Sequence, residues 1–168
     1  MDVKGKVVVV TGGACGIGKG LCRRFVREDA KKVIVADVNE AGAKSVADEI
    51  KATAVTCDAS KEEDIIHLVR FTEEKFGPID LFCSNAGIIV LGGVEADNED
   101  WKRIWEINVL AHVYAARAVL PGMIKRGGGA FMVTASAAGL LSQIGSLPYS
   151  VTKHAAVGFA ENIAITYG

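Results

Sequence analysis

Tyr149 and Lys153 stand four residues apart, a spacing that can support proton transfer. A free tyrosine has a pKa of about 10 and is a poor base near neutral pH, but a nearby ammonium group favours the phenolate and lowers that pKa. If residues 149–167 form a helix, both side chains lie on one face, one turn apart. The pair could then exchange a proton with an alcohol or carbonyl oxygen. On its own, the pattern also fits a helix-start tyrosine beside a solvated lysine.

A glycine-rich turn follows the first apolar run of the chain. Residues 6–11 include four consecutive valines, and the next glycines have GxxxGxG spacing. Such glycines permit a tight turn, close approach of the backbone to a pyrophosphate and close packing of a helix on a sheet. Free N–H groups at the start of the helix then favour phosphate. We predict a dinucleotide-binding turn, with a ligand-free structural turn as the alternative. Its cofactor-binding residues would be Gly12, Cys15, Gly16, Ile17 and Gly18.

Asp37 ends the second apolar run, residues 32–36, at the 19th position after Gly18. A carboxylate about 20 residues beyond such a turn typically binds the ribose 2′-hydroxyl. It would also repel a 2′-phosphate, and neither Cys15 nor Val38 offers a cation to hold one. The sequence therefore favours NAD over NADP. The alternative is that Asp37 only forms a turn or caps a helix.

The elements that must position these groups alternate along the chain. We expect strands at 6–11, 32–36, 53–57, 79–83 and 130–135, and helices at 18–29, 40–51, 62–76, 100–126 and 149–167. Such alternation argues for βαβ units with right-handed crossovers. The expected fold is α/β, a Rossmann-like doubly wound parallel sheet between two helix layers, with strand order 3-2-1-4-5. Residues 1–168 would form a single dinucleotide-binding domain.

Composition excludes several other classes of function. Nineteen basic and 20 acidic side chains give a formal charge of −1, which provides no footprint for nucleic acid or an anionic membrane. Apolar runs are shorter than the ~18 residues of a membrane span. Nothing resembles a metal site or a disulfide framework, so a reducing, cytoplasmic location is expected. Three of the four cysteines are expected in the core, and the four are Cys15, Cys22, Cys57 and Cys83. The histidines are expected to be surface or packed residues, and they are His67, His112 and His154.

In combination, these motifs resemble the compact branch of the short-chain dehydrogenase/reductase family. The likeness continues through Cys57-Asp58-Ala59 after the third strand and through Ile107-Asn108-Val109 in the long helix. The segment Ser84-Asn85-Ala86-Gly87 is similar to the family's NNAG motif, with serine in place of the first asparagine. Ser136 lies 13 positions before Tyr149, like the family's active-site serine. The segment 149–153 matches its YxxxK motif.

The resemblance implies a role for each of these residues. Lys153 would also bind the nicotinamide ribose, Ser136 would orient the substrate oxygen beside Tyr149, and Asn108 would hold a water that links Lys153 to solvent. Ser136 could instead be a turn serine, and Asn108 could be a mid-helix polar kink. Asp58 would contact the adenine. The further implied cofactor-binding residues are Asp58, Ala59, Asn85, Ala86, Gly87, Tyr149 and Lys153.

Taken with the resemblance, the sequence predicts NAD-dependent hydride transfer between nicotinamide and a secondary alcohol or ketone. Apolar residues in the segment 139–147 suggest a hydrophobic substrate. The helices that begin at Asp100 and Tyr149 resemble a dimer interface of the family, so a homodimer or homotetramer is expected. Family members continue past the position of Gly168 with two further strands, and the pocket here would lack one wall. The alternative is a truncated nucleotide-binding fragment or interaction module without catalysis.

Overall fold

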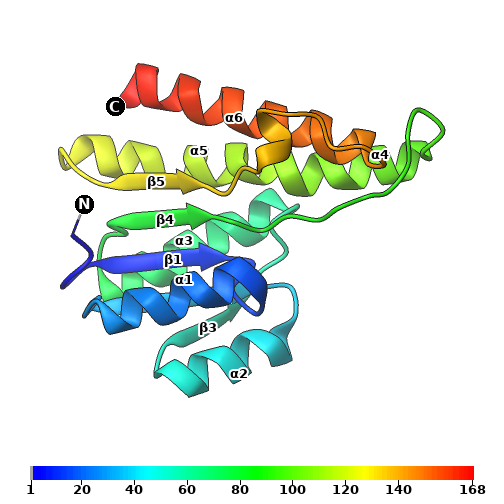
Figure 1. Cartoon of the computed structure of the whole chain (residues 1–168). Coiled ribbons are helices and arrows are strands. Elements are labelled where there is room, and N and C mark those ends of the chain that lie inside the picture. Colours follow the sequence, from blue (N-terminus) through cyan, green and yellow to red (C-terminus); the bar gives the residue numbers. More distant parts are fainter. Residues whose placement is uncertain (1) are drawn as a thin grey trace.

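The computed structural model describes residues 2–168 (Figure 1). The chain alternates between strands and helices, as the sequence predicts. The elements are β1 (Val7–Thr11), α1 (Gly16–Arg27), β2 (Lys32–Asp37), α2 (Glu40–Ile50), β3 (Thr53–Thr56), α3 (Glu62–Phe76), β4 (Leu81–Ser84), α4 (Asn98–Trp105), η1 (Glu106–Leu110), α5 (Ala111–Lys125), β5 (Ala130–Val133), η2 (Ala137–Gly139) and α6 (Leu147–Tyr167).

All five strands are parallel and lie in the order β3-β2-β1-β4-β5, which confirms the predicted topology. The central strand is the valine run, where Val9 pairs with Ile34 on one side and Phe82 on the other. Every residue of β1 is buried. A strand covered on both faces needs apolar side chains on both, which explains its uninterrupted run of valines.

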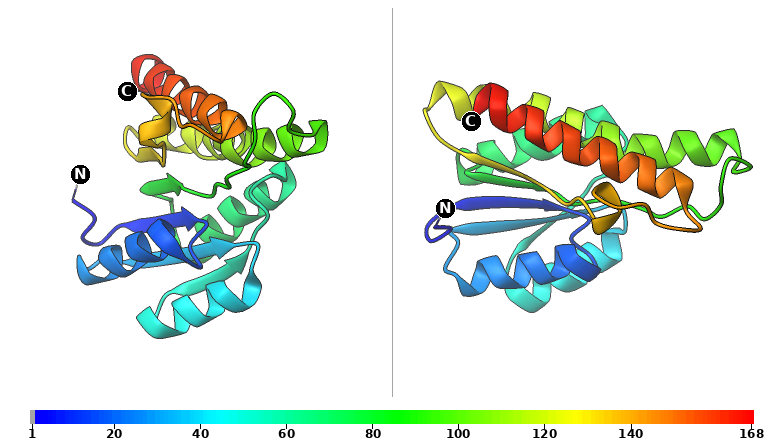
Figure 2. Two further views of the ribbon diagram at one scale, coloured as in Figure 1. Left: turned by 45° about the vertical axis from the view of Figure 1, so that its right-hand side comes forward. Right: turned by 45° about the horizontal axis from the view of Figure 1, so that its top comes forward.

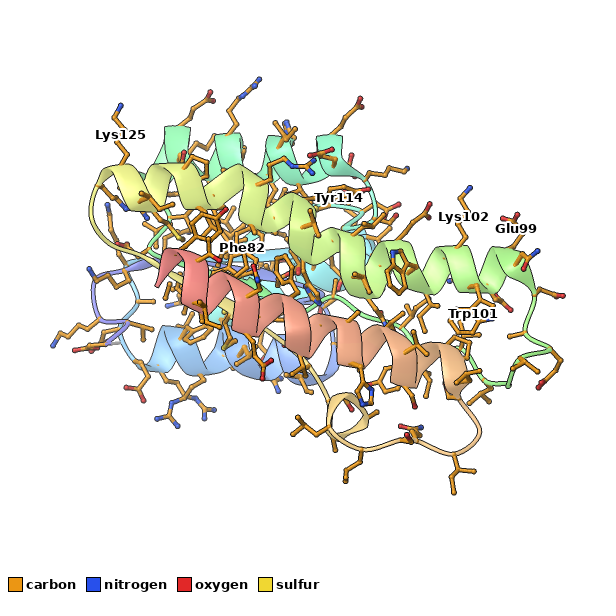
Figure 3. All side chains as sticks on the ribbon, turned by 90° about the horizontal axis from the view of Figure 1, so that it is seen from above. Phe82, Glu99, Trp101, Lys102, Tyr114 and Lys125 are labelled. Atoms are coloured by element: carbon orange, nitrogen blue, oxygen red, sulfur yellow. The ribbon has the colours of Figure 1, made fainter. Side chains whose placement is uncertain are left out.

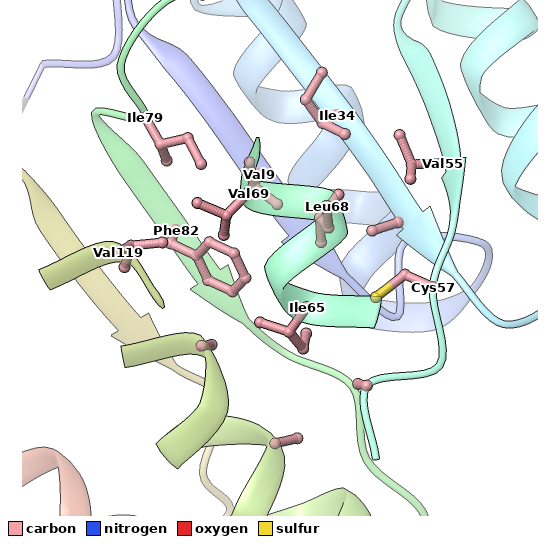
Figure 4. Packing of buried hydrophobic residues seen from close by; sticks show 14 of the residues in the cluster. Val9, Ile34, Val55, Cys57, Ile65, Leu68, Val69, Ile79, Phe82 and Val119 are labelled. Atoms are coloured by element: carbon pink, nitrogen blue, oxygen red, sulfur yellow. The ribbon is translucent and has the colours of Figure 1, made fainter. Parts of the chain in front are cut away.

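Helices cover both faces of the sheet (Figure 2). Helices α1 and α2 pack over one face, against a cluster that includes Val8, Val10 and Val35. The opposite face carries α3 and α5, whose buried side chains meet Phe82 and Ile34 (Figure 4). On this second face α6 lies beside α5, and its Phe159 ring meets Phe131 of β5 edge-on. The three layers match the predicted architecture.

The expected helix at 100–126 begins at Asn98 and runs to Lys125 through a five-residue π-helical segment, η1. Figure 3 shows this helix beside α6, with Lys102 and Lys125 reaching outward. By length and composition alone it could cross a membrane, contrary to the expectation that no segment would. Of its most apolar window, 44% is buried inside the fold, and its core-facing residues pack with α3 and the sheet. Core packing therefore accounts for its apolar character.

Several predicted boundaries differ from those observed. The last helix begins at Leu147, two residues earlier than expected, because Pro148 fits the first turn of a helix. The first helix likewise begins at Gly16 rather than Gly18. The fourth strand occupies Leu81–Ser84 rather than 79–83. Helix α3 has the predicted bounds. These shifts bring the helix starts closer to the carboxyl edge of the sheet.

Candidate functional site

A pocket of about 630 Å3 opens at the carboxyl ends of the strands, the place where doubly wound sheets usually bind ligands. Its lining comes from the turn after β1, the end of β2, the loops after β3, β4 and β5, and the start of α6. The structure brings all thirteen residues predicted to bind a cofactor to this pocket: Gly12, Cys15, Gly16, Ile17, Gly18, Asp37, Asp58, Ala59, Asn85, Ala86, Gly87, Tyr149 and Lys153. Their contact with a cofactor stays a prediction.

The glycine turn leaves room that no larger residue would leave. A Cβ atom on Gly18 would lie 2.0 Å from the Gly12 carbonyl oxygen, and one on Gly12 would lie 2.9 Å from Cα of Ala86. Gly12 and Gly16 also have φ angles of +67° and +51°, which side chains disfavour. The N-cap residue of α1, Cys15, makes no capping hydrogen bond, and the first turn carries no acidic residue. The N-terminal end of α1 can therefore donate N–H groups to an anion.

Two carboxylates approach the pocket from β2 and from the loop after β3. Asp37 accepts hydrogen bonds from the N–H groups of Ala14 and Asn39, at 3.0 and 2.9 Å. The first of these bonds ties Asp37 to the glycine turn. Partial burial opposes the ionisation of Asp58, but hydrogen bonds from the Ser60 hydroxyl and backbone lower its pKa below the usual value. Both residues thus place an acceptor group on the cofactor side.

The side chain of Asn85 joins three strand ends. Its amide nitrogen donates to the carbonyl oxygens of Thr11 and Gly12, and its oxygen accepts from the Thr134 hydroxyl at 2.9 Å. The backbone N–H groups of Asn85 and Ala86 donate to the Thr11 hydroxyl oxygen. Sequence reasoning did not single out Thr11 or Thr134, although a polar residue at the end of a buried strand is a usable signal. We call these three residues, Thr11, Asn85 and Thr134, the Asn85 network.

Tyr149 and Lys153 lie together on α6, with the Lys153 Nζ atom 5.7 Å from the centre of the Tyr149 ring. Lys153 is only 3% exposed, and Nζ donates to the Thr134 carbonyl at 2.9 Å. Burial lowers the pKa of Lys153, because it disfavours the charged form. Tyr149 is half-buried at the pocket wall. The predicted proximity of the two side chains is therefore confirmed.

Asn108 and Ser136 are not among the residues that line the pocket in the described part of the chain, residues 2–168. Asn108 sits in η1 and is fully buried. Its side chain exchanges two hydrogen bonds with the backbone of Ile88 and donates a third to the Thr152 hydroxyl. Asn108 therefore lies in a π-helical irregularity of the long helix, while the kink and the water predicted at this residue remain predictions. Ser136 caps η2 through its hydroxyl, which accepts from the Ala138 N–H at 3.1 Å. A turn role for Ser136 is therefore observed as well.

His112 is packed, one of the two alternatives for the histidines, and it is also hydrogen-bonded. Its Nδ1 lies 2.7 Å from the Ser84 hydroxyl, and its ring stacks with Phe159. Burial, with a smaller effect from the Lys153 charge, lowers the pKa of His112 to about 4. The residue is therefore neutral. Ser84 stands where the family's NNAG motif has its first asparagine. The hydrogen bond with His112 is therefore made by the residue that departs from the motif.

Two loops, residues 88–97 and 140–146, contribute Ile88, Ile89 and Gln143 to the pocket lining, and we call these loops the rim. A short parallel bridge joins them, in which the Gly92 N–H donates to the Gly145 carbonyl and the Leu147 N–H donates to the Gly92 carbonyl. The Ser146 hydroxyl also donates to the Val90 carbonyl. Large apolar side chains are exposed on both loops, namely Ile89, Leu91, Val94, Leu140, Leu141 and Ile144.

Three of the four cysteines, Cys22, Cys57 and Cys83, are buried as expected, and Cys15 is exposed in the glycine turn. Within residues 2–168, no group of three or more His, Cys, Asp or Glu residues could hold a metal ion. Tyr149 in this pocket could transfer a proton next to the uncapped N-terminal end of α1.

Comparison with known proteins gives a consistent family assignment. The model of the short chain dehydrogenase family matches residues 6–168. The chain is 33% identical to 3beta-hydroxysteroid dehydrogenase 2 of Eggerthella lenta, over 97% of this chain and 65% of the relative. It is 35% identical to zerumbone synthase of Zingiber zerumbet, over 100% and 65%, respectively. The crystal structure of a short chain dehydrogenase/reductase from Burkholderia phymatum in complex with NAD superposes with a TM-score of 0.94 at 28% identity. That match covers 97% of this chain and 60% of the other, so this chain spans less than two thirds of the length of these relatives.

Proposed function

Because this chain belongs to the short chain dehydrogenase family, we propose that it binds NAD and oxidises a secondary alcohol, or reduces the corresponding ketone, with Tyr149 as the acid/base. The observation that carries this proposal is the joint placement of the Tyr149–Lys153 pair and the glycine turn in one pocket. The turn would bind the pyrophosphate of the dinucleotide, and Tyr149 would exchange the proton that accompanies hydride transfer.

The residues fit a dinucleotide. Gly12 and Gly18 hold the turn so close that a methyl group would collide with backbone, and the uncapped start of α1 offers N–H groups to the pyrophosphate. The Asp37 carboxylate stands at the end of β2, where the adenosine ribose would lie. Its negative charge favours a free 2′-hydroxyl and therefore NAD over NADP. The loop of Asp58 and Ala59 would border the adenine.

When bound, NAD supplies the hydride acceptor for the alcohol carbon. Tyr149 takes the proton from the alcohol oxygen as the ketone forms, and it returns that proton in the reverse direction. Lys153 stabilises the phenolate by its charge and would contact the nicotinamide ribose. Ser136 would hold the substrate oxygen beside Tyr149, and Asn108 would hold a water next to Lys153. The overall reaction converts one alcohol and NAD+ to one ketone, NADH and one proton.

The rim favours a bulky apolar substrate. Leu140, Leu141 and Ile144 are 74%, 69% and 99% exposed, and their burial against a ligand would remove apolar surface from water. One relative is a 3beta-hydroxysteroid dehydrogenase, and a hydroxysteroid is a bulky apolar cyclic alcohol. We therefore expect a hydrophobic cyclic alcohol or ketone.

The α5–α6 face supports association of two copies. A groove of about 340 Å3 lies between these helices, and most of its lining is apolar: Val113, Ala116, Leu120, Ile124, Phe159 and Ile163. Ile124 is 53% exposed, which is unusual for a residue in such a cluster unless a partner covers it. We expect a homodimer through this face, and a monomeric mass in sedimentation equilibrium would contradict it.

The test of the reaction uses the purified chain, NAD and a panel of apolar secondary alcohols, with NADH absorbance as the readout. Tyr149→Phe should lower kcat by about 10²- to 10⁴-fold, the usual contribution of a general acid/base. The Kd for NAD should stay within about twofold of the Kd of the unaltered chain. Tyr114→Phe is the matched control, because Tyr114 lies on α5 against the core.

Undiminished turnover by Tyr149→Phe would refute the acid/base role. Binding of NAD without turnover of any alcohol or ketone in the panel would favour the alternative, a nucleotide-binding fragment without catalysis.

A further inference from the structure

Thr152 lies between the two residues of the Tyr149–Lys153 pair and is fully buried. Its hydroxyl makes two hydrogen bonds. The oxygen accepts from the Asn108 amide nitrogen at 3.1 Å, and the hydroxyl hydrogen is donated to the Tyr149 carbonyl at 3.0 Å. The Thr152 side chain thus connects α6, which carries Tyr149, with Asn108, which anchors the loop after β4.

The connection extends to the pocket wall. Asn108 holds Ile88 on both sides, because its oxygen accepts the Ile88 N–H at 2.8 Å and its nitrogen donates to the Ile88 carbonyl at 2.9 Å. Ile88 lines the pocket. A Cβ atom on the preceding Gly87 would lie 3.2 Å from the Asn108 oxygen and 3.5 Å from the Lys153 Nζ atom. The pocket wall, Asn108 and Lys153 therefore meet within a few ångströms.

The local backbone makes this contact specific. Asn108 sits in the π-helical segment Glu106–Leu110, and a π segment inside a helix displaces the following residues from the regular α-helical face. A buried hydroxyl on α6 that receives the Asn108 amide fixes the rotation of α6 against this segment. A hydroxyl that bonds a carbonyl of the preceding turn also biases the local helix geometry, here at the turn that carries Tyr149.

We propose that Thr152 is a positioning residue: its hydroxyl, held between Asn108 and the Tyr149 carbonyl, sets the position of Tyr149 and Lys153 relative to the pocket wall. This inference rests on the proposed function, since it concerns the placement of the same acid/base. It makes Thr152 necessary for the rate of proton transfer and dispensable for binding of the dinucleotide. Displacements of about 1 Å at a reacting group can cost 10²-fold in rate.

The test compares three variants of the full chain. Thr152→Val keeps the shape of the side chain and removes both hydrogen bonds. Thr152→Ser keeps the hydroxyl and removes a methyl group. Thr72→Val is the matched control, since Thr72 is also a fully buried helical threonine whose hydroxyl donates to a carbonyl of the preceding turn, that of Leu68. Thr72 lies on α3 and does not line the pocket.

We expect Thr152→Val to lower kcat by about 10-fold or more, with the KM for NAD changed less than about threefold. Thr152→Ser should restore the rate. Thr72→Val should lose thermal stability comparably to Thr152→Val while keeping the original kcat. A Thr152→Val variant with the original kcat, or a Thr152→Ser variant as impaired as Thr152→Val, would overturn the inference.

A second readout separates this inference from the proposed function. The NMR spectrum of the chain with 13C-labelled tyrosine rings, compared with that of the Tyr149→Phe variant, identifies the ring signal of Tyr149 without any substrate. Thr152→Val should shift that signal, and Thr72→Val should leave it in place. If the unaltered chain shows no turnover but this shift is found, the positioning role stands and the reaction fails. If turnover is present and the shift is absent, the positioning role fails and the reaction stands.

Discussion

The cofactor side of the pocket and its rim are built in opposite ways. On the cofactor side, polar side chains of the Asn85 network join β1, β4 and β5 by hydrogen bonds, and Gly12 and Gly18 leave no room for a Cβ atom. At the rim, the two loops are joined mainly through backbone groups, and large apolar side chains such as Ile144 stand almost fully in solvent. The proposed function thus assigns cofactor binding to the hydrogen-bonded side of the pocket and substrate selection to loops that can vary without loss of the core.

The largest effect should come from the glycine turn. Gly18→Ala would place a methyl group 2.0 Å from the Gly12 carbonyl oxygen, so we expect a loss of stability of about 3 kcal/mol and a loss of NAD affinity of about 100-fold. Gly20→Ala is the control in the same helix, where a Cβ atom meets nothing within 4 Å. It should be neutral or slightly stabilising. Urea unfolding and NAD titration measure both, and equal behaviour of the two variants would contradict the close packing.

A second test addresses His112, a buried residue next to Ser84 at the end of β4. The pKa of His112 is about 4 in the fold and 6.5 in the absence of burial, so between these values the unfolded chain binds a proton that the folded chain does not. Neutral, buried His112 therefore makes its full contribution to the free energy of unfolding above pH 6.5, and this contribution is lost as the pH falls toward 4. Between pH 7 and pH 5 it should amount to about 2 kcal/mol.

Urea unfolding at the two pH values measures this dependence, and His112→Gln should reduce it. His67→Gln, at an exposed position on α3, should leave the dependence unchanged. An identical pH dependence in the unaltered chain and in His112→Gln would show that another group is responsible.

The Asp37 carboxylate should have a smaller, selective effect. Asp37→Asn keeps an oxygen that can accept from the Ala14 N–H but removes the charge that disfavours a 2′-phosphate. We expect NAD to bind about tenfold more weakly, or about 1.4 kcal/mol, and the preference over NADP to narrow. Asp48→Asn on the exposed face of α2 makes the same change of net charge outside the pocket. A preference that is unaffected by Asp37→Asn would remove Asp37 from cofactor selection.

The smallest effect should come from the rim. Ile144→Ser removes an apolar group that is 99% exposed, so the fold should lose almost no stability, while KM for an apolar alcohol should rise about threefold through lost burial on binding. Affinity for NAD should not change. Ile165→Ser, at a position that is 84% exposed on α6, is the matched control. An unchanged KM for every apolar substrate would argue against contact between the rim and the substrate.

Strong periodicity made much of the architecture predictable. The valine run of β1 identified a central strand, and α3 was predicted with its observed bounds because its apolar positions repeat at helical spacing. The thirteen predicted cofactor-binding residues all line the pocket, since each follows directly on a strand or belongs to a recognisable motif, but lining residues such as Thr134 and Ile88 were not predicted. The π segment was not, because its sequence, Glu106–Leu110, differs little from an ordinary helical stretch.

The sequence by itself determined the order of strands and helices, the glycine turn and the four-residue spacing of Tyr149 and Lys153, because these depend on local residue types and on periodicity. Only the tertiary structure decided which side chains support them. Thr152 meets Asn108 across 44 positions of sequence, and Thr134 meets Asn85 across 49. Such contacts arise when packing brings distant segments together, and a single threonine has no local signal that specifies its partner.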